Sequence, residues 1–188
     1  MKKLIALSLI PLLFGCLSAS SPRVSQWLLE YKGPVRATRL TKYEVGRVSQ
    51  VTVRSPYNEV GIAVLRADGS MAFDPYNEYA ANPTAMLKGF VFDAMDASGL
   101  FGSVVNPSSS VRSSAQAEVL VSRLALDCRA EGERKAVASV RVRIVADAER
   151  ALYAQGEGEA DAADGNYGAA LSAALSAALD SAFGQFRR

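Results

Sequence analysis

Apolar and polar residues alternate in several segments of this chain, and such alternation predicts strands with one buried face. We expect these strands at residues 27–31, 43–54, 60–67, 71–76 and 101–105. Asp68-Gly69 predicts a hairpin turn between the third and the fourth of them. Gly46 predicts a bulge in the second strand, where the alternation slips by one residue.

Two longer alternating segments follow a serine-rich loop, and residues 151–159 continue them as the third strand of a meander. In the first, we expect one face to carry Leu120, Leu124, Leu126 and Cys128, with Cys128 buried as a small apolar residue. In the second, an apolar face comprises Ala136, Ala138, Val140, Val142, Ile144 and Ala146. The opposite face carries Lys135, Ser139, Arg141 and Arg143 and is interrupted by Val137.

A helical period predicts one helix between the two groups of strands. Asn82 is expected as its N-cap, Pro83 as its first residue and Gly99 as the residue that ends it. Its apolar face comprises Met86, Leu87, Phe90, Val91, Ala94 and Met95. Phe92 falls among the polar positions, so it is a candidate partner contact unless a loop covers it.

Residues 165–186 predict a second helix, in which Leu171, Leu175, Leu179 and Phe183 recur every four residues. Alanine and serine fill most other positions, which lets the helix lie close to a sheet. The serines and Asp180 interrupt the apolar run and argue against a membrane-spanning helix. The order of elements predicts the α+β class, an antiparallel sheet with two main helices packed on one face of a single domain.

The N-terminus has a different pattern. Two lysines precede a short apolar run that ends in Gly15-Cys16, which is typical of an export signal and too short for a spanning helix. With Leu13 three residues before Cys16, this segment resembles the lipobox of bacterial lipoproteins; an ordinary signal peptide is the alternative. The resemblance implies acylation of Cys16, for example by palmitate. We therefore expect a signal peptide at 1–15, a lipidated N-terminus and tether at 16–25, and a folded domain at 26–188.

Composition narrows the function classes. Removal of Lys2 and Lys3 with the signal leaves 19 of the 21 basic residues against 19 acidic ones, and this balance argues against nucleic acid. The sequence has no histidine, and Cys128 is the only cysteine besides Cys16. Both facts argue against Cys/His zinc sites and histidine-dependent catalysis. The acidic residues of 157–164 lack EF-hand spacing. We expect no enzyme, no metal and no cofactor.

Arg141 and Arg143 form the first candidate surface, suited to a lipid phosphate or an acidic partner. A solvated strand face that opposes aggregation is the alternative interpretation.

The segment 76–104 is the second candidate. It reads Tyr76-Asn77-Glu78-Tyr79 before the helix start at Asn82-Pro83, and Ser98-Gly99-Leu100-Phe101 after the helix; a strand ending in Arg66 precedes it. This pattern resembles the ABC-type transport auxiliary lipoprotein family, the outer-membrane lipoproteins that accompany MCE-type lipid transport systems. Members often carry tryptophan where this chain has Tyr79.

The resemblance implies a non-enzymatic auxiliary component that docks a periplasmic lipid conduit to the outer membrane. It implies an MCE-domain protein and ABC transporter components as partners, allows a homo-oligomer around the conduit, and places Tyr76 and Tyr79 on a partner-facing or lipid-facing surface. Leu17 after Cys16, in place of aspartate, favours the periplasmic face of the outer membrane over inner-membrane retention. An outer-membrane assembly lipoprotein that partners a β-barrel, of the lipopolysaccharide-assembly type, is the alternative.

Overall fold

The computed structural model describes residues 23–34, 41–147 and 150–187, which form one α+β domain. The predicted signal peptide, Cys16 and most of the tether lie outside the described residues. The elements are β1 (Ser25–Trp27), β2 (Tyr43–Val53), β3 (Gly61–Arg66), β4 (Met71–Tyr79), α1 (Pro83–Ala97), β5 (Phe101–Val105), β6 (Ala115–Cys128), β7 (Lys135–Asp147), β8 (Arg150–Asp161) and α2 (Tyr167–Gln185).

Strand β6 organises the sheet. One of its edges pairs antiparallel with β7, which in turn pairs with β8. The other edge pairs in parallel first with β2 and then, near its end, with β3. Beyond these, β5 lies beside β2, β4 lies beside β3, and β1 runs parallel to β4.

The sheet is therefore mixed, and the expectation of a wholly antiparallel sheet is corrected. Parallel neighbours need a long crossover between them. The β3–β4 hairpin and α1 lie in sequence between β2 and β6, so the chain can return to the same end of the sheet before it starts β6. The α+β class and the predicted hairpin at Asp68-Gly69 are confirmed.

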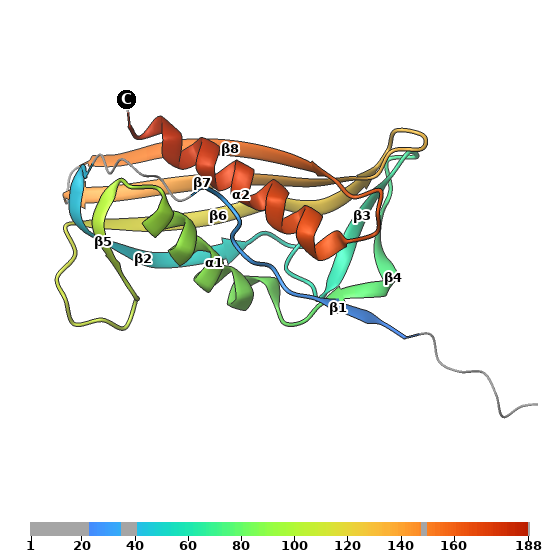
Figure 1. Ribbon diagram of the computed structural model, residues 1–188, viewed down its shortest axis with the longest axis horizontal. Coiled ribbons are helices and arrows are strands. Elements are labelled where there is room, and N and C mark those ends of the chain that lie inside the picture. The colour runs from blue at the N-terminus through green and yellow to red at the C-terminus, as the bar shows by residue number, and fades with distance from the viewer. Residues whose placement is uncertain (1–22, 35–40, 148–149, 188) are drawn as a thin grey trace, which may run out of the picture.

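Both helices cover the same face of the sheet, as predicted (Figure 1). Helix α1 begins at Pro83, with the Asn82 side chain accepting a hydrogen bond from the Thr84 N–H at 3.0 Å. The turn after it uses Gly99 at a φ of 68°, which glycine adopts without strain. The predicted apolar faces are buried, except that Met86 is half-buried. Neither helix in the described part of the chain is long and apolar enough to cross a bilayer.

Helix α2 lies very close to β8, because both surfaces carry small residues. A Cβ added to Gly156 would stand 1.9 Å from the carbonyl oxygen of Ala178, and one added to Gly158 would stand 2.0 Å from that of Ala174. The alanine-rich face of α2 and the two glycines therefore allow the backbones to approach, as the composition of the helix predicts.

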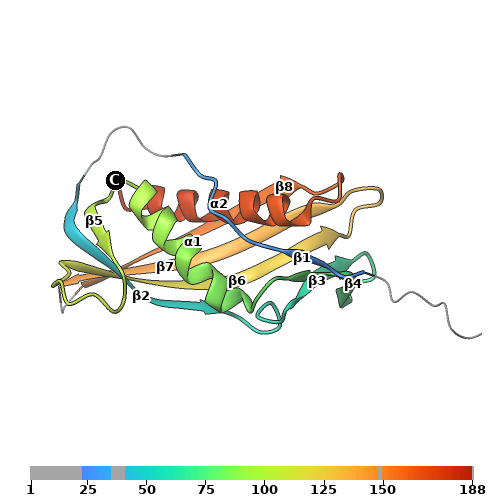
Figure 2. The same ribbon diagram turned by 60° about the horizontal axis from the view of Figure 1, so that its bottom comes forward.

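Residues 28–34 pass between α1 and α2 instead of continuing the first strand (Figure 2). The backbone N–H groups of Glu30 and Lys32 donate to the hydroxyl groups of Ser172 and Ser176 at 3.1 and 3.0 Å. Because these hydroxyls replace a strand partner, β1 is only Ser25–Trp27 and the expected strand at 27–31 is wrong. Ser25, the last residue of the predicted tether, belongs to β1.

Two bulges shift the register in ways that simple alternation does not predict. The bulge in β2 lies between Val48 and Gln50 and not at Gly46. A second, between Val121 and Arg123 in β6, reverses the alternation, so Leu120 lies opposite Arg141 on the uncovered face. The expected common face of Leu120, Leu124 and Leu126 is therefore wrong. Cys128, at the end of β6, is half-buried rather than buried.

Candidate functional site

The face of the sheet that the helices leave uncovered carries both candidate arginines. Arg141 and Arg143 lie on β7 on either side of Val142, which is fully buried beneath the helices. Because successive side chains of a strand point to opposite faces, both guanidinium groups reach the uncovered face. The register with β6 and β8 then places Arg143 between Glu118 and Tyr153.

Arg143 is held in place by these two neighbours. Its Nη1 donates to Oε2 of Glu118 at 2.9 Å, and its guanidinium lies 5.9 Å from the centre of the Tyr153 ring. The hydrogen bond that Arg143 donates to Glu118, and then the negative charge of Glu118, raise the pKa of Arg143 above its ordinary value. The side chain is therefore both charged and oriented, while its buried Nε has no hydrogen-bond partner among the described residues.

Arg141 differs from Arg143 because it forms no ion pair among the described residues. Its side chain is exposed, and it stands between Leu120 of β6 and Gln155 of β8, neither of which is charged. A guanidinium presents five N–H donors in a planar fork that matches a carboxylate or a phosphate. Arg141 is thus available for an anionic group outside the chain.

Two hollows flank Arg141, and we call this region the Arg141 surface. The first has a volume of about 240 Å³ and is lined by Gln50, Thr52, Glu118, Val119, Leu120, Arg141, Arg143 and Tyr153. The second has about 230 Å³ and is lined by Arg54, Ser122, Arg123, Ser139, Val140, Arg141, Gln155, Gly156 and Glu157. Both are smaller than the roughly 300–1,000 Å³ typical of small-molecule sites. They suit a carboxylate side chain or a single phosphate better than an acyl chain.

The other predicted surface residues do not join this region. Tyr79 is 1% exposed because it pairs with Trp27 of β1 beneath the helices, so its expected surface role is corrected. Burial raises the pKa of Tyr79, and its hydroxyl has no hydrogen-bond partner in the described part of the chain. Phe92 is half-buried and packs against the core. Tyr76 is 54% exposed, but it lies on β4, away from the Arg141 surface.

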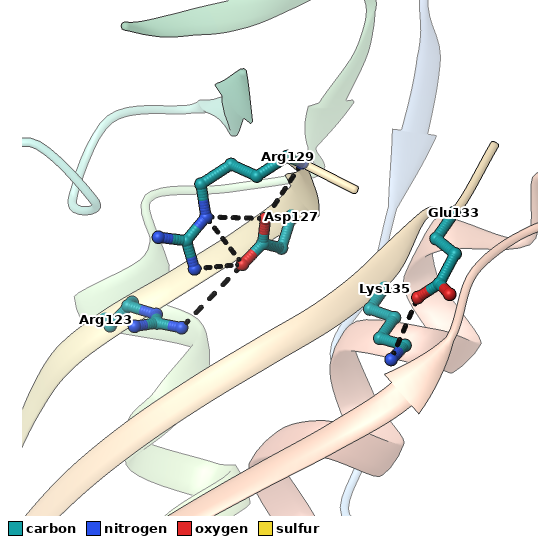
Figure 3. Close-up of polar contacts among 5 residues, drawn as sticks. All are labelled: Arg123, Asp127, Arg129, Glu133 and Lys135. Carbon is teal, nitrogen blue, oxygen red and sulfur yellow. Dashed lines mark hydrogen bonds and ion pairs between the residues drawn. The ribbon is translucent and has the colours of Figure 1, made fainter. Parts of the chain in front are cut away.

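A second charged cluster lies near the end of β6, where its members pair with one another (Figure 3). Asp127 and Arg129 are 2.6 Å apart between Oδ2 and Nη2, and Nη2 of Arg123 approaches the same oxygen at 4.0 Å. Lys135 binds Glu133 at 3.0 Å. The hydrogen bond from Arg129 lowers the pKa of Asp127. Because these charges neutralise one another, this cluster is a weaker candidate for an external ligand than Arg141.

Sequence analysis missed Glu118 and Tyr153. The alternation in 151–159 contained a signal for Tyr153, since it falls in phase with Gln155 and Glu157. Only the register of β6, β7 and β8 brings these side chains to Arg143. In the described part of the chain, no group of three or more histidine, cysteine, aspartate or glutamate residues could hold a metal ion.

Comparisons with known proteins identify the fold. No family model matches the chain, and no curated protein matches it either. A DUF330 protein from Xanthomonas campestris has a TM-score of 0.60 at 14% identity, over 87% of this chain and 98% of that one. An uncharacterized protein has a TM-score of 0.55 at 14% identity, over 85% and 94% of the two chains. A PelC dodecamer from Paraburkholderia phytofirmans scores only 0.36 at 12% identity, over 79% and 94%, and supports no argument.

The lack of a family match corrects the assignment to the ABC-type transport auxiliary lipoprotein family. The residues that suggested it have local structural roles: Pro83 begins α1, and Gly99 turns the chain after this helix toward β5. Such residues determine where a helix starts and ends, and unrelated chains can have the same residues at these positions. What is shown is an α+β fold in common with the DUF330 protein.

Proposed function

We propose that this chain is a non-enzymatic lipoprotein, acylated at Cys16 and anchored on the periplasmic side of the outer membrane. In this proposal it docks an ABC-linked, MCE-type lipid conduit to that membrane through the Arg141 surface. The observation that carries the docking role is Arg141 itself, an exposed guanidinium without an ion pair among the described residues, on the face that the helices leave uncovered.

The N-terminal sequence supports the anchoring step. A basic start, a short apolar run and Gly15-Cys16 precede the fold, and Leu17 follows the cysteine. Several acyl chains on one residue would hold the protein stably without a basic patch, which agrees with a mature chain that carries equal numbers of basic and acidic residues.

Docking is supported over catalysis by the chemistry of the uncovered face. The titratable groups that line its two hollows are arginines, carboxylates and Tyr153, without the histidine that general acid–base catalysis uses most often. A charged, oriented guanidinium beside an exposed aromatic ring is instead typical of protein interfaces, where arginine and tyrosine are enriched. An acidic side chain of the partner would occupy the hollow beside Arg141.

An affinity pull-down of the acylated protein from detergent-solubilised membranes tests this proposal. Wild type, Arg141→Glu and Lys88→Glu would be compared by mass spectrometry; Lys88→Glu makes the same charge change on the exposed side of α1. We expect an MCE-domain protein or its permease with wild type and Lys88→Glu, and at least a tenfold loss with Arg141→Glu. Circular dichroism of each variant checks the fold.

Three outcomes would overturn parts of the proposal. Recovery of a β-barrel protein in place of the conduit would favour the outer-membrane assembly role. Equal recovery with Arg141→Glu would exclude the Arg141 surface. If wild type and Cys16→Ala both fractionate as soluble protein, the anchoring step is wrong. Association of several copies around the conduit stays a prediction, which crosslinking of the membrane-bound protein would test.

A further inference from the structure

Exposed apolar side chains gather at one end of the molecule. Among the described residues, five of the eight exposed large hydrophobic side chains lie on β1, β3 or β4 or one residue from them: Val24, Leu28, Val60, Phe73 and Tyr76. The other three are Val111, Leu152 and Tyr153. Strands β1, β3 and β4 lie together at one end, and the start of β8, with Tyr153, lies toward the other (Figure 1).

The register of β1 and β4 places part of this set beside the point where the described chain begins. Ser25 pairs with Asn77 and Trp27 with Tyr79, in parallel, so Val24 lies level with Tyr76. Tyr79 is buried on the helix side, and alternation along the strands turns Val24 and Tyr76 away from that side. Val24 is 47% and Tyr76 54% exposed.

The local structure of β4 holds Tyr76 outward. Between the pairs Ala63–Phe73 and Gly61–Glu78, four residues of β4 have no partner on β3, so this segment bulges from the sheet. Within the bulge, Oδ1 of Asp74 accepts hydrogen bonds from the Tyr76 N–H at 2.8 Å and from Nδ2 of Asn77 at 3.0 Å. Phe73, at the edge of the same bulge, is 41% exposed.

The distance to the acylation site limits what this surface can meet. Arg23, where the described chain begins, follows Cys16 by seven steps along the chain, with six residues between them. Even a fully extended segment of this length spans at most about 25 Å. A lipid on Cys16 would therefore keep Arg23 within about 25 Å of the bilayer, and Val24 and Tyr76 lie next to this point of the chain.

We infer that Val24, Phe73 and Tyr76 form a lipid-contacting surface that rests on the bilayer in which Cys16 is anchored. The inference rests on the proposed acylation and adds the orientation of the domain. Tyrosine suits this position because its ring enters the apolar zone while its hydroxyl stays with the headgroups. Arg23, next to Val24, would lie near anionic headgroups, which attract its positive charge.

Fluorescence quenching by brominated lipids tests this contact. The acylated protein would be reconstituted into phosphatidylethanolamine–phosphatidylglycerol vesicles with bromine on the acyl chains. Trp27 is the only tryptophan, so Trp27→Phe combined with Tyr76→Trp gives one reporter at the proposed surface. Trp27→Phe combined with Tyr153→Trp is the matched control, because Tyr153 is 64% exposed and lies at the opposite end. We expect emission to fall at least twofold with Tyr76→Trp and to stay constant with Tyr153→Trp.

A second measurement keeps Trp27, so that it does not depend on the fold tolerating Trp27→Phe. Tyr76→Trp and Tyr153→Trp would each also be measured with Trp27 kept, because Trp27 packs beside Tyr167 on the helix side and adds the same emission to both variants. Quenching should again be greater with Tyr76→Trp. One outcome is that the protein floats with the vesicles while the tryptophans at positions 76 and 153 are both unquenched or are quenched equally. In that case the proposed lipid-contacting surface is wrong, and the proposed anchoring is unaffected. If the protein does not float with the vesicles, the proposed anchoring fails, and this inference fails with it.

Discussion

The two faces of the sheet are formed by the same strands but differ in burial: the helices cover one face and leave the other exposed. On the helix side of β7, the side chains of Ala136, Val140 and Val142 are at most 2% exposed. On the other side of the same strand, Arg141 and Arg143 reach solvent. Among the described residues, the uncovered face has only a small buried cluster, formed by Ala63, Ala125 and Val137.

This difference indicates where stability and recognition reside. Burial of apolar surface contributes roughly 25 cal/mol per Å², so most of the stabilisation belongs to the helix side. Exposed polar positions on the uncovered face can vary at little cost in stability. A binding surface can therefore occupy the uncovered face while the helix side maintains the fold. The following predictions test this comparison, from the largest expected effect to the smallest.

Truncation of a leucine should affect the two faces very differently. Leu175→Ala on α2 removes a fully buried side chain and leaves a cavity, so we expect a loss of about 2–5 kcal/mol in the free energy of unfolding. Leu120→Ala makes the same change on the uncovered face, where the side chain is half-buried, and should cost about 1 kcal/mol. Urea denaturation measures both. Equal losses would mean that the two faces contribute equally to stability.

The close approach of α2 and β8 can be tested by the addition of one methyl group. Gly158→Ala would place a Cβ 2.0 Å from the carbonyl oxygen of Ala174, so the helix must move, and we expect a loss of about 1–3 kcal/mol. Gly89→Ala is the control, because it meets no atom within 4 Å on the exposed side of α1 and should gain about 0.5–1 kcal/mol. Thermal unfolding of both variants gives the result; a stable Gly158→Ala would contradict the close contact.

A smaller effect should appear at acid pH, at the charged cluster of Figure 3. Arg129 lowers the pKa of Asp127 below its ordinary value of 3.8 in the folded state. Asp127 therefore stabilises the fold above that pH, and this contribution is lost as the pH falls through the folded pKa. Because Arg129 is 54% exposed, solvent weakens the pair and the contribution is small.

The test compares unfolding midpoints of wild type and Asp127→Asn at neutral and at acid pH. The difference between the two proteins should be present at neutral pH and vanish in acid. Asp93→Asn, a substitution at an exposed position of α1, is the control. A difference for Asp127→Asn that persists in acid would show that the side chain acts through packing and not through its charge.

The sequence predicted best the features that depend on neighbours along the chain. Asn82, Pro83 and Gly99 start and end α1 through backbone geometry and one side-chain hydrogen bond, all within a few residues. Strand β1 was less predictable, because Ser172 and Ser176, far along the chain, determine that residues 28–34 are not a strand. The candidate site shows the same division between local and distant effects. Alternation along β7 correctly placed Arg141 and Arg143 on one face. Tyr79 was expected at the surface, but its pairing with β1 buries it.

The sequence by itself determined the α+β class, the two helices and the two faces of β7, because periodicity and caps are local properties of the chain. Tertiary structure alone decided that the sheet is mixed, that a bulge in β6 carries Leu120 to the uncovered face, and that Glu118 and Tyr153 meet Arg143. These features depend on strand pairing between distant segments. Pairing is set by which faces can be buried together, and that choice is made only when the whole sheet and both helices assemble.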